Sequence, residues 1–360
     1  MASSTVAQTT NTVLRVKARQ RNARVVVVGA FAALCVTVVV ALGTGAMDIS
    51  SAEVIRILLS ELRLPIEPLS EGREHQVITV IRLPRVVAGV LVGATLAVSG
   101  GVLQGLFRNP LAGPGLIGVS SGASLAAAAI IVLAPGGASF WMRPTAAFFG
   151  SALVTALVYL LATRAGRTDM ATMLLAGVAL NALAGAGTGL LTFIADDDQL
   201  RDITFWSLGS LGGISWRMIR VTAPIMIVGI VLPARFARPL NVILLGERDA
   251  KHVGVNVQVL KVVCVGCVAA AVGAAVAISG TIGFVGLVAP HLVRLSIGPD
   301  HRTLLPGAAI VGATLLLLAD LFARTVAAPA EVPIGIVTAL VGGPFFLWLL
   351  LRYRRRSVYA

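Results

Sequence analysis

Residues 81–104 read IRLPRVVAGVLVGATLAVSGGVLQ, and the charged side chains in this stretch are the two arginines near its start, Arg82 and Arg85. A helix needs about 20 apolar residues to cross the hydrocarbon core of a bilayer, and the run after Arg85 fits that length. Gly and Ala recur within it, as they do where helices pack closely in lipid. The stretch therefore predicts a membrane-spanning helix with two basic residues at one end.

Apolar runs of this kind recur along the chain and determine the fold class. Hydrophobic residues make up 57% of the 360 residues and charged residues 12%, whereas an ordinary soluble domain has about 25% charged residues. We predict an all-α membrane protein with about ten transmembrane helices. The candidate spans are 25–46, 83–106, 115–134, 145–163, 171–194, 218–234, 258–279, 282–297, 303–323 and 333–351.

This count divides the chain into three parts. Residues 1–24 are a basic N-terminal segment, 25–351 a single ten-helix transmembrane domain, and 352–360 a basic C-terminal tail. The first apolar run follows five basic residues and is longer than the apolar core of a typical signal peptide, so we expect it to remain as the first span.

The distribution of basic residues predicts the orientation of the chain. With the N-terminus in the cytoplasm, 19 of the 29 Lys and Arg residues lie on the inner side and 10 on the outer side, as the positive-inside rule requires. Both termini are therefore expected in the cytoplasm, with Arg82 and Arg85 on the outer face. We attribute the net charge of +13 to the basic residues that orient the chain in the membrane, and not to nucleic-acid binding.

An internal repeat relates the two halves of the chain. Shifting the sequence by 180 residues aligns 92–118 with 272–298, with identity at nine of 27 positions. The copies start on the second and seventh spans, so they enter the membrane from opposite sides, and spans 2–5 and 7–10 form an inverted repeat typical of transporters. Further on, 144–153 matches 306–315 at a shift of 162, so 18 residues are missing around the eighth span, which we expect to be short.

Motifs for enzymatic chemistry are absent from the sequence. It contains no GxxxxGK[ST] nucleotide loop and no HExxH or GxSxG motif, so we expect no catalytic residue and no enzyme activity. Asp320 is the only carboxylate well inside a span, and we interpret it as a hydrogen-bonding partner of a neighbouring helix. An ion-driven carrier usually needs several such groups, yet it stays the alternative from another class.

Cysteine and histidine residues do not indicate a metal centre. Cys35, Cys264 and Cys267 lie within apolar runs, and the CxxC pair Cys264/Cys267 is interpreted as packed core thiols, with a redox or metal motif as the alternative. The histidines lie in loops or near span ends, and none is assigned as a metal ligand: His75, His252, His291 and His301.

The longest inner loop, roughly 235–257, contains an amphipathic segment. Leu245, Ala250, Val253 and Val255 recur at near-helical spacing among charged residues. A short helix pair that ends at Gly254 would offer a surface to a cytoplasmic partner. A helix lying on lipid headgroups is the alternative.

Several stretches together resemble the permease family of type II ABC importers for cobalamin, haem and iron-siderophores. These stretches cover the chain from residue 81 almost to its end at the spacing typical of that family. They are IRLPRVVAGVLVGATLAVSG, LQGLFRNPLAGPGLIGVSSG, LLGERDAKHVGVNV, TIGFVGLVAPHLVR, GPDHRTLLPG and AEVPIGIVTALVGGPFFLWLL.

The resemblance implies a set of partners and a location. Two permeases surround a central path in the bacterial inner membrane, two ATPase subunits bind ATP below them, and a periplasmic binding protein delivers substrate from above. The chain is then expected to pair with a second copy of itself, to contact membrane lipid and to hold no permanent cofactor. It would not hydrolyse ATP itself.

The resemblance also assigns inner-side residues to roles. Gate candidates are Asn109 and Leu111 in FRNPLAG; Asn109–Pro110 also has the sequence of an ordinary Asx-Pro turn, and the two interpretations are compatible. The second gate segment reads GRTDMAT, where Asp169 and Met170 depart from the small hydroxyl residues of the cobalamin member. The segment implied to couple to the ATPase comprises Gly246, Glu247, Ala250, Val253 and Gly254.

On the outer side, the resemblance assigns Arg82, Arg85 and Arg324 to docking of the binding protein through its glutamates. Pro84 allows a break at the helix entrance that would point Arg82 and Arg85 at solvent, with snorkelling to lipid headgroups as the alternative. We expect Arg324 to be held by an intrahelical pair with Asp320, four residues before it.

The transported substrate is expected to be haem. Residues 181–213, NALAGAGTGLLTFIADDDQLRDITFWSLGSLGG, resemble the haem branch of the family more than the siderophore branches. A ferric siderophore or cobalamin is the alternative cargo.

Overall fold

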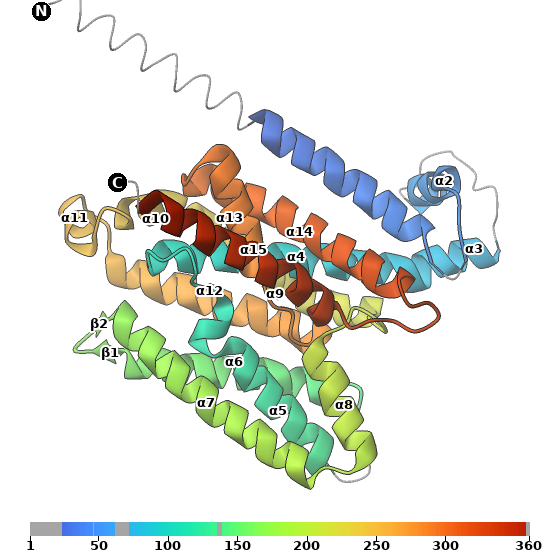
Figure 1. Ribbon diagram of the computed structural model, residues 1–360, viewed down its shortest axis with the longest axis horizontal. Coiled ribbons are helices and arrows are strands. Elements are labelled where there is room, and N and C mark those ends of the chain that lie inside the picture. Colours follow the sequence, from blue (N-terminus) through green and yellow to red (C-terminus); the bar gives the residue numbers. More distant parts are fainter. Residues whose placement is uncertain (1–23, 46, 62–71, 135–138, 358–360) are drawn as a thin grey trace, which may run out of the picture.

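The computed structural model describes residues 24–45, 47–61, 72–134 and 139–357, and within them the chain is almost wholly helical (Figure 1). The predicted segment 1–24 therefore lies almost entirely outside the described residues. The first helix is Arg24–Gly43. It is followed by α2 (Ser51–Glu61), α3 (Arg73–Gln76), η1 (Val77–Arg82), α4 (Leu83–Leu106), η2 (Pro114–Ile117), α5 (Val119–Leu133), α6 (Met142–Leu161), α7 (Met170–Ile194), α8 (Asp197–Leu208), α9 (Trp216–Arg235), α10 (Ala237–Ile243), α11 (Glu247–His252), α12 (Val257–Ser279), α13 (Val285–Ile297), α14 (His301–Thr325) and α15 (Ile334–Ser357).

The all-α membrane architecture is confirmed. Within the described residues, seven helices are long and apolar enough to cross a bilayer, and three shorter apolar helices fall at the third, eighth and tenth expected spans. The shorter helices are Val119–Leu133, Val285–Ile297 and Ile334–Leu349. Every predicted run is thus helical, and the count of ten crossings stays a prediction.

The two halves run through the bundle in opposite directions. Helix α4 enters from the end that holds α2 and α3, whereas α12 enters from the end that holds α10 and α11 (Figure 1). This is the arrangement expected of an inverted repeat. The predicted shortness of the eighth span is confirmed, because α13 has 13 residues and extends only about 20 Å at 1.5 Å per residue.

Helix α4 is the centre of the fold because its small residues let other helices approach closely. It packs against α14, α13, α12 and α9. A Cβ atom at Gly100 would collide with the backbone of Gly286 in α13, and one at Gly93 would collide with the backbone of Gly312 in α14. Small residues at such contacts are the usual basis of helix association in lipid.

Helix α7 lies at the edge of the bundle and exposes an apolar face. Leu175, Leu183 and Phe193 have 76%, 68% and 85% of their surface exposed. In water such a face would be unstable. It fits a chain surrounded by lipid or by another membrane-embedded subunit.

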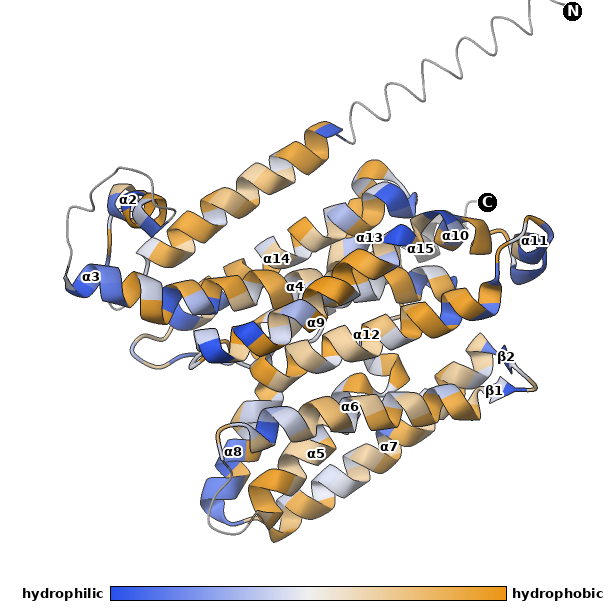
Figure 2. Cartoon of the chain, turned by 180° about the vertical axis from the view of Figure 1, so that it is seen from behind, coloured by the Kyte–Doolittle hydropathy of each residue, from blue (hydrophilic) through white to orange (hydrophobic). Residues whose placement is uncertain are grey.

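The polar segments gather at the two ends of the bundle (Figure 2). We call the end with α10, α11 and the hairpin β1 (Thr163–Arg164) and β2 (Arg167–Thr168) the α11 end. The opposite end, with α2, α3 and α8, is the α2 end (Figure 1). The orientation predicted from charge makes the α11 end cytoplasmic.

Candidate functional site

The β1–β2 hairpin at the α11 end positions the start of α7. Its turn residues Ala165 and Gly166 have φ angles of 51° and 71°, a left-handed pair that suits a two-residue hairpin turn. Asp169 follows β2 directly, and its carboxylate accepts hydrogen bonds from the backbone N and the hydroxyl of Thr172, at 2.7 and 2.6 Å. These bonds cap α7 and hold the pKa of the Asp169 carboxyl below its usual value.

The predicted helix pair in the inner loop is present as α10 and α11. Gly246 and Gly254 bound α11, and their φ angles of 133° and 86° strain any residue with a Cβ. Leu245 and Val253, one on each side of α11, are 75% and 69% exposed, so these two apolar side chains are left uncovered by the part of the chain that the structure describes. Ala250 is fully buried, so its predicted place on the partner-facing surface was wrong, and it instead packs α11 onto the bundle.

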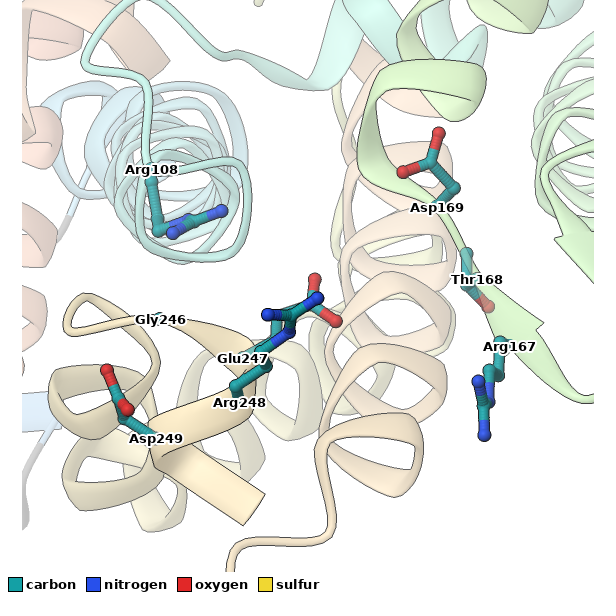
Figure 3. Close-up of a pocket in the computed structure, with 8 residues that line it drawn as sticks. All are labelled: Arg108, Arg167, Thr168, Asp169, Gly246, Glu247, Arg248 and Asp249. Carbon is teal, nitrogen blue, oxygen red and sulfur yellow. The ribbon is translucent and has the colours of Figure 1, made fainter. Parts of the chain in front are cut away.

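The predicted gate and coupling segments surround one cavity of about 560 Å³. Figure 3 shows that its lining comes from the end of α4, the junction of β2 with α7, and the start of α11. The lining residues carry three positive and three negative charges: Arg108, Arg167, Thr168, Asp169, Gly246, Glu247, Arg248 and Asp249. Asp169, Gly246 and Glu247 were predicted to be functional residues of two separate segments, and the structure brings them together around this cavity. The three arginines of the lining were not predicted.

The Asn109–Pro110 motif is a turn, as one of the two interpretations predicted. The side-chain oxygen of Asn109 accepts a hydrogen bond of 2.9 Å from the backbone N of Leu111, and Leu111 is 51% exposed. The turn follows Arg108, whose side chain lines the cavity. Its gate role stays a prediction.

A buried lysine, not singled out from the sequence, joins these segments. Lys261 in α12 has a side chain that is 1% exposed, and its Nζ lies 2.6 Å from Glu247 Oε1. The same Nζ donates a 2.7 Å hydrogen bond to the carbonyl oxygen of Thr168. The sequence indicates only that Lys261 lies near the start of an apolar run. A charged residue there usually marks the end of a membrane span, so it does not by itself predict a buried ion pair.

A cluster of arginines and carboxylates occupies the α2 end. Arg85 Nη2 lies 2.8 Å from Asp320 Oδ1, and Arg85 Nη1 lies 2.7 Å from Glu331 Oε1. The predicted pairing of Asp320 with a neighbouring helix is confirmed by these contacts. The predicted intrahelical pair is also present, with Arg324 Nε 3.7 Å from Asp320 Oδ2.

The expectation that Arg82 and Arg85 point at solvent was wrong, because both side chains are largely buried, with 14% of the Arg85 side chain exposed. Pro84 causes no break, and the helix runs unbroken from Arg73 to Leu106. The segment just before it, Val77–Arg82, is π-helical, and such a local change of hydrogen-bond pattern accommodates a proline inside a helix. Arg82 is 6% exposed. Its guanidinium donates to the carbonyl oxygens of Leu42, Gly43 and Met47.

Arg324 is likewise engaged with the end of the first helix. It donates to the carbonyl oxygens of Thr44, at 2.8 Å, and of Ala41. The outermost member of the cluster is Glu331, whose side chain is 45% exposed. The hydrogen bond from Arg85 holds the pKa of the Glu331 carboxyl below its usual value.

Residues 33–352 match the FecCD transport family. The chain belongs to the FecCD transport family. This confirms the resemblance to permeases of type II ABC importers, and it agrees with a multi-pass membrane protein.

Relatives of this FecCD chain include permeases named for hemin and for cobalamin. It is 50% identical over 279 residues to the hemin transport system permease protein HmuU of Yersinia pestis, covering 77% of this chain and 83% of that protein. It is 46% identical to the cobalamin import system permease protein BtuC of Halobacterium salinarum, covering 79% and 75%. It is 42% identical to the vitamin B12 import system permease protein BtuC of Escherichia coli O9:H4, covering 76% and 83%.

A solved structure has the same fold as this FecCD chain. It is described as a metal-chelate type ABC transporter in an inward-facing conformation. It superposes with a TM-score of 0.79 at 34% identity, and the match covers 91% of this chain and 98% of that one.

Proposed function

We propose that this permease carries haem across the bacterial inner membrane. The observation that supports haem is the 50% identity to a hemin permease, against 46% and 42% to two cobalamin permeases. Haem would be transported cargo, and the chain would hold no permanent cofactor. A ferric siderophore or cobalamin is the second candidate cargo.

We propose that a separate ATPase subunit drives transport. The exposed Leu245 and Val253 flank α11 beside a charged cavity, and an apolar surface rimmed by charge suits a protein partner. A homodimer with two ATPase subunits, both termini in the cytoplasm, would place this surface next to the ATPases. A periplasmic binding protein would then meet the α2 end.

The structure weakens the alternative of an ion-driven carrier. Asp320 is fully buried, and its carboxylate is already bonded to Arg85 and paired with Arg324. A carboxylate neutralised by two guanidiniums is a poor site for a transported proton or sodium ion.

Reconstitution of the chain with its ATPase and binding protein in liposomes tests both parts of the proposal. Labelled haem uptake should require ATP, and unlabelled haem should compete better than cobalamin or a ferric siderophore. Preferred uptake of either competitor would replace haem as the cargo. Uptake driven by a proton gradient without the ATPase would overturn the ABC-importer mechanism.

A further inference from the structure

Lys261 is a buried charge that contacts two segments far apart in the sequence. Its Nζ bonds Glu247, the first residue of α11, and the carbonyl oxygen of Thr168, the last residue of β2. A buried ammonium is costly unless its hydrogen bonds are made, and an apolar side chain of similar length would fill the site with less penalty. Stability alone therefore gives a weak reason for a lysine here.

Thr168 is also held by the neighbouring side chain of α12. Gln258 Oε1 accepts a 3.1 Å hydrogen bond from the backbone N of Thr168, and Gln258 Nε2 donates to the Thr168 hydroxyl at 2.7 Å. The same Nε2 donates to the Tyr159 hydroxyl in α6 at 2.7 Å. The backbone of Thr168 is thus fixed to α12 at both its N–H and its carbonyl group.

These contacts form a short path from α11 to the start of α7. A displacement of α11 would move Glu247 and, through the ion pair, would act on Lys261 and on the Thr168 carbonyl bonded to it. Asp169 is the next residue and caps α7 through Thr172. Hydrogen bonds to charged groups in a low-dielectric site are stiff links.

We infer that Lys261 is a positioning residue that transmits movement of α11 to the Thr168–Asp169 gate segment. This inference rests on the proposed role of α11 in ATPase coupling and names the contact through which coupling passes. A competing path exists through the packing of α10 on α4, α12 and α14. The experiment must therefore separate movement of α11 from movement at Thr168.

Hydrogen exchange of the assembled transporter, with and without ATP, makes that separation. In the unaltered complex, ATP should change amide exchange both in residues 237–256 and in residues 163–172. In Lys261→Met, the change in 237–256 should persist while the change in 163–172 is lost. Haem-stimulated ATP hydrolysis should fall by about two- to thirty-fold, the range seen when coupling residues are altered.

Two further variants keep the test independent of folding. Glu247→Gln removes the ion pair at a half-exposed position and leaves the bond from Lys261 to Thr168, so it should give the same loss at 163–172 even if Lys261→Met fails to assemble. Arg164→Met removes a positive charge from the same hairpin at an exposed residue without a role in this path. It should behave as the unaltered chain does.

The outcomes separate this inference from the proposed function. An unchanged ATP response at 163–172 in both Lys261→Met and Glu247→Gln would overturn the role of Lys261 while leaving ATPase coupling intact. An unaltered complex in which ATP changes neither segment would overturn the coupling role of α11, and the role of Lys261 with it.

Discussion

Arg85 and Asp320 join α4 to α14 across the α2 end, with Arg85 Nη2 and Asp320 Oδ1 2.8 Å apart. The Asp320 side chain is 1% exposed and also faces Arg324. The aspartate therefore compensates two guanidiniums inside a helix bundle. Its position explains how a membrane-embedded carboxylate is retained without being an ion-binding site.

Asp320→Asn should destabilise the protein strongly, because two buried arginines would then share one partly exposed carboxylate. Breaking a buried pair typically costs about 3–5 kcal/mol. Thermal unfolding in detergent measures the effect. Asp198→Asn is the matched control, since Asp198 is 93% exposed and 3.9 Å from Arg201, and its unfolding midpoint should not change. Equal midpoints for the two variants would show that the buried pair is not structural.

Glu331 should give the protein an acid-sensitive contribution to stability. Its folded-state pKa lies below the ordinary 4.5 because Arg85 donates a hydrogen bond to its carboxylate. The contribution is therefore fully present above pH about 4.5 and is lost as the pH falls through the lowered pKa. Because the side chain is partly exposed, about 0.2–1 kcal/mol is expected. Unfolding midpoints of the unaltered chain and Glu331→Gln should differ at pH 7 and converge in acid. A difference that persists in acid would contradict this origin.

Docking of a binding protein at the α2 end should become tighter in Glu331→Gln. If partner glutamates bind Arg85, they compete with Glu331 for its guanidinium, so loss of the Glu331 charge should raise affinity about two- to five-fold, the equivalent of one exposed ion pair. Affinity measured at low and high salt tests this, and the gain should shrink at high salt. Unchanged affinity at low salt would remove Arg85 from the docking surface.

The burial of Arg82 and Arg324 changes how docking must be tested. Glutamates at these two positions would place carboxylates against backbone carbonyl oxygens, which cannot donate a hydrogen bond. Reversing Arg82, Arg85 and Arg324 together would therefore damage the fold, and a loss of docking in that variant would be uninformative.

Val253→Asp should release the ATPase subunit without unfolding the permease. Val253 is 69% exposed beside Gly254, so the change places a charge on the apolar surface proposed for the partner. Co-purification of the ATPase should fall while the unfolding midpoint of the permease stays constant. Val253→Ala should have a smaller effect. Normal co-purification of Val253→Asp would favour a helix that lies on lipid headgroups.

Gly100→Ala should prevent α4 and α13 from packing closely. The added methyl group would collide with the backbone of Gly286, which is not a flexible side-chain end, and overpacking of a core typically costs about 1–3 kcal/mol. Gly266→Ala in α12 is the matched control, because a Cβ there meets nothing within 4 Å. It should leave stability unchanged or raise it by up to about 1 kcal/mol. If Gly100→Ala and Gly266→Ala have the same unfolding midpoint, the close contact of α4 with α13 does not determine stability.

The ten apolar helices could be predicted from sequence because each one is specified locally by an apolar run, whereas the polar helices α2 and α8 lie outside such runs and were not predicted. The short α13 could also be predicted, since the repeat fixes where residues are missing. Lys261 could not, because its partners are a carboxylate 14 residues earlier and a carbonyl oxygen 93 residues earlier. Because every residue has a backbone carbonyl group, the sequence does not indicate which one accepts a hydrogen bond from a distant side chain. The same reason explains the wrong expectation for Arg82, whose acceptors are also carbonyl oxygens.

Arg82 and Arg324 together complete the C-terminal end of the first helix, whose last carbonyl groups have no partners within the helix. The positive charges of these arginines also interact favourably with the partial negative charge at the C-terminal end of the helix. The carbonyl oxygen of Thr44 accepts its hydrogen bond from Arg324, which lies 280 positions later in the sequence. During synthesis on the ribosome, the first helix therefore enters the membrane long before its final partner exists. Its end reaches the native arrangement only when the penultimate helix has been made, so a chain truncated before α14 should hold its first helix loosely.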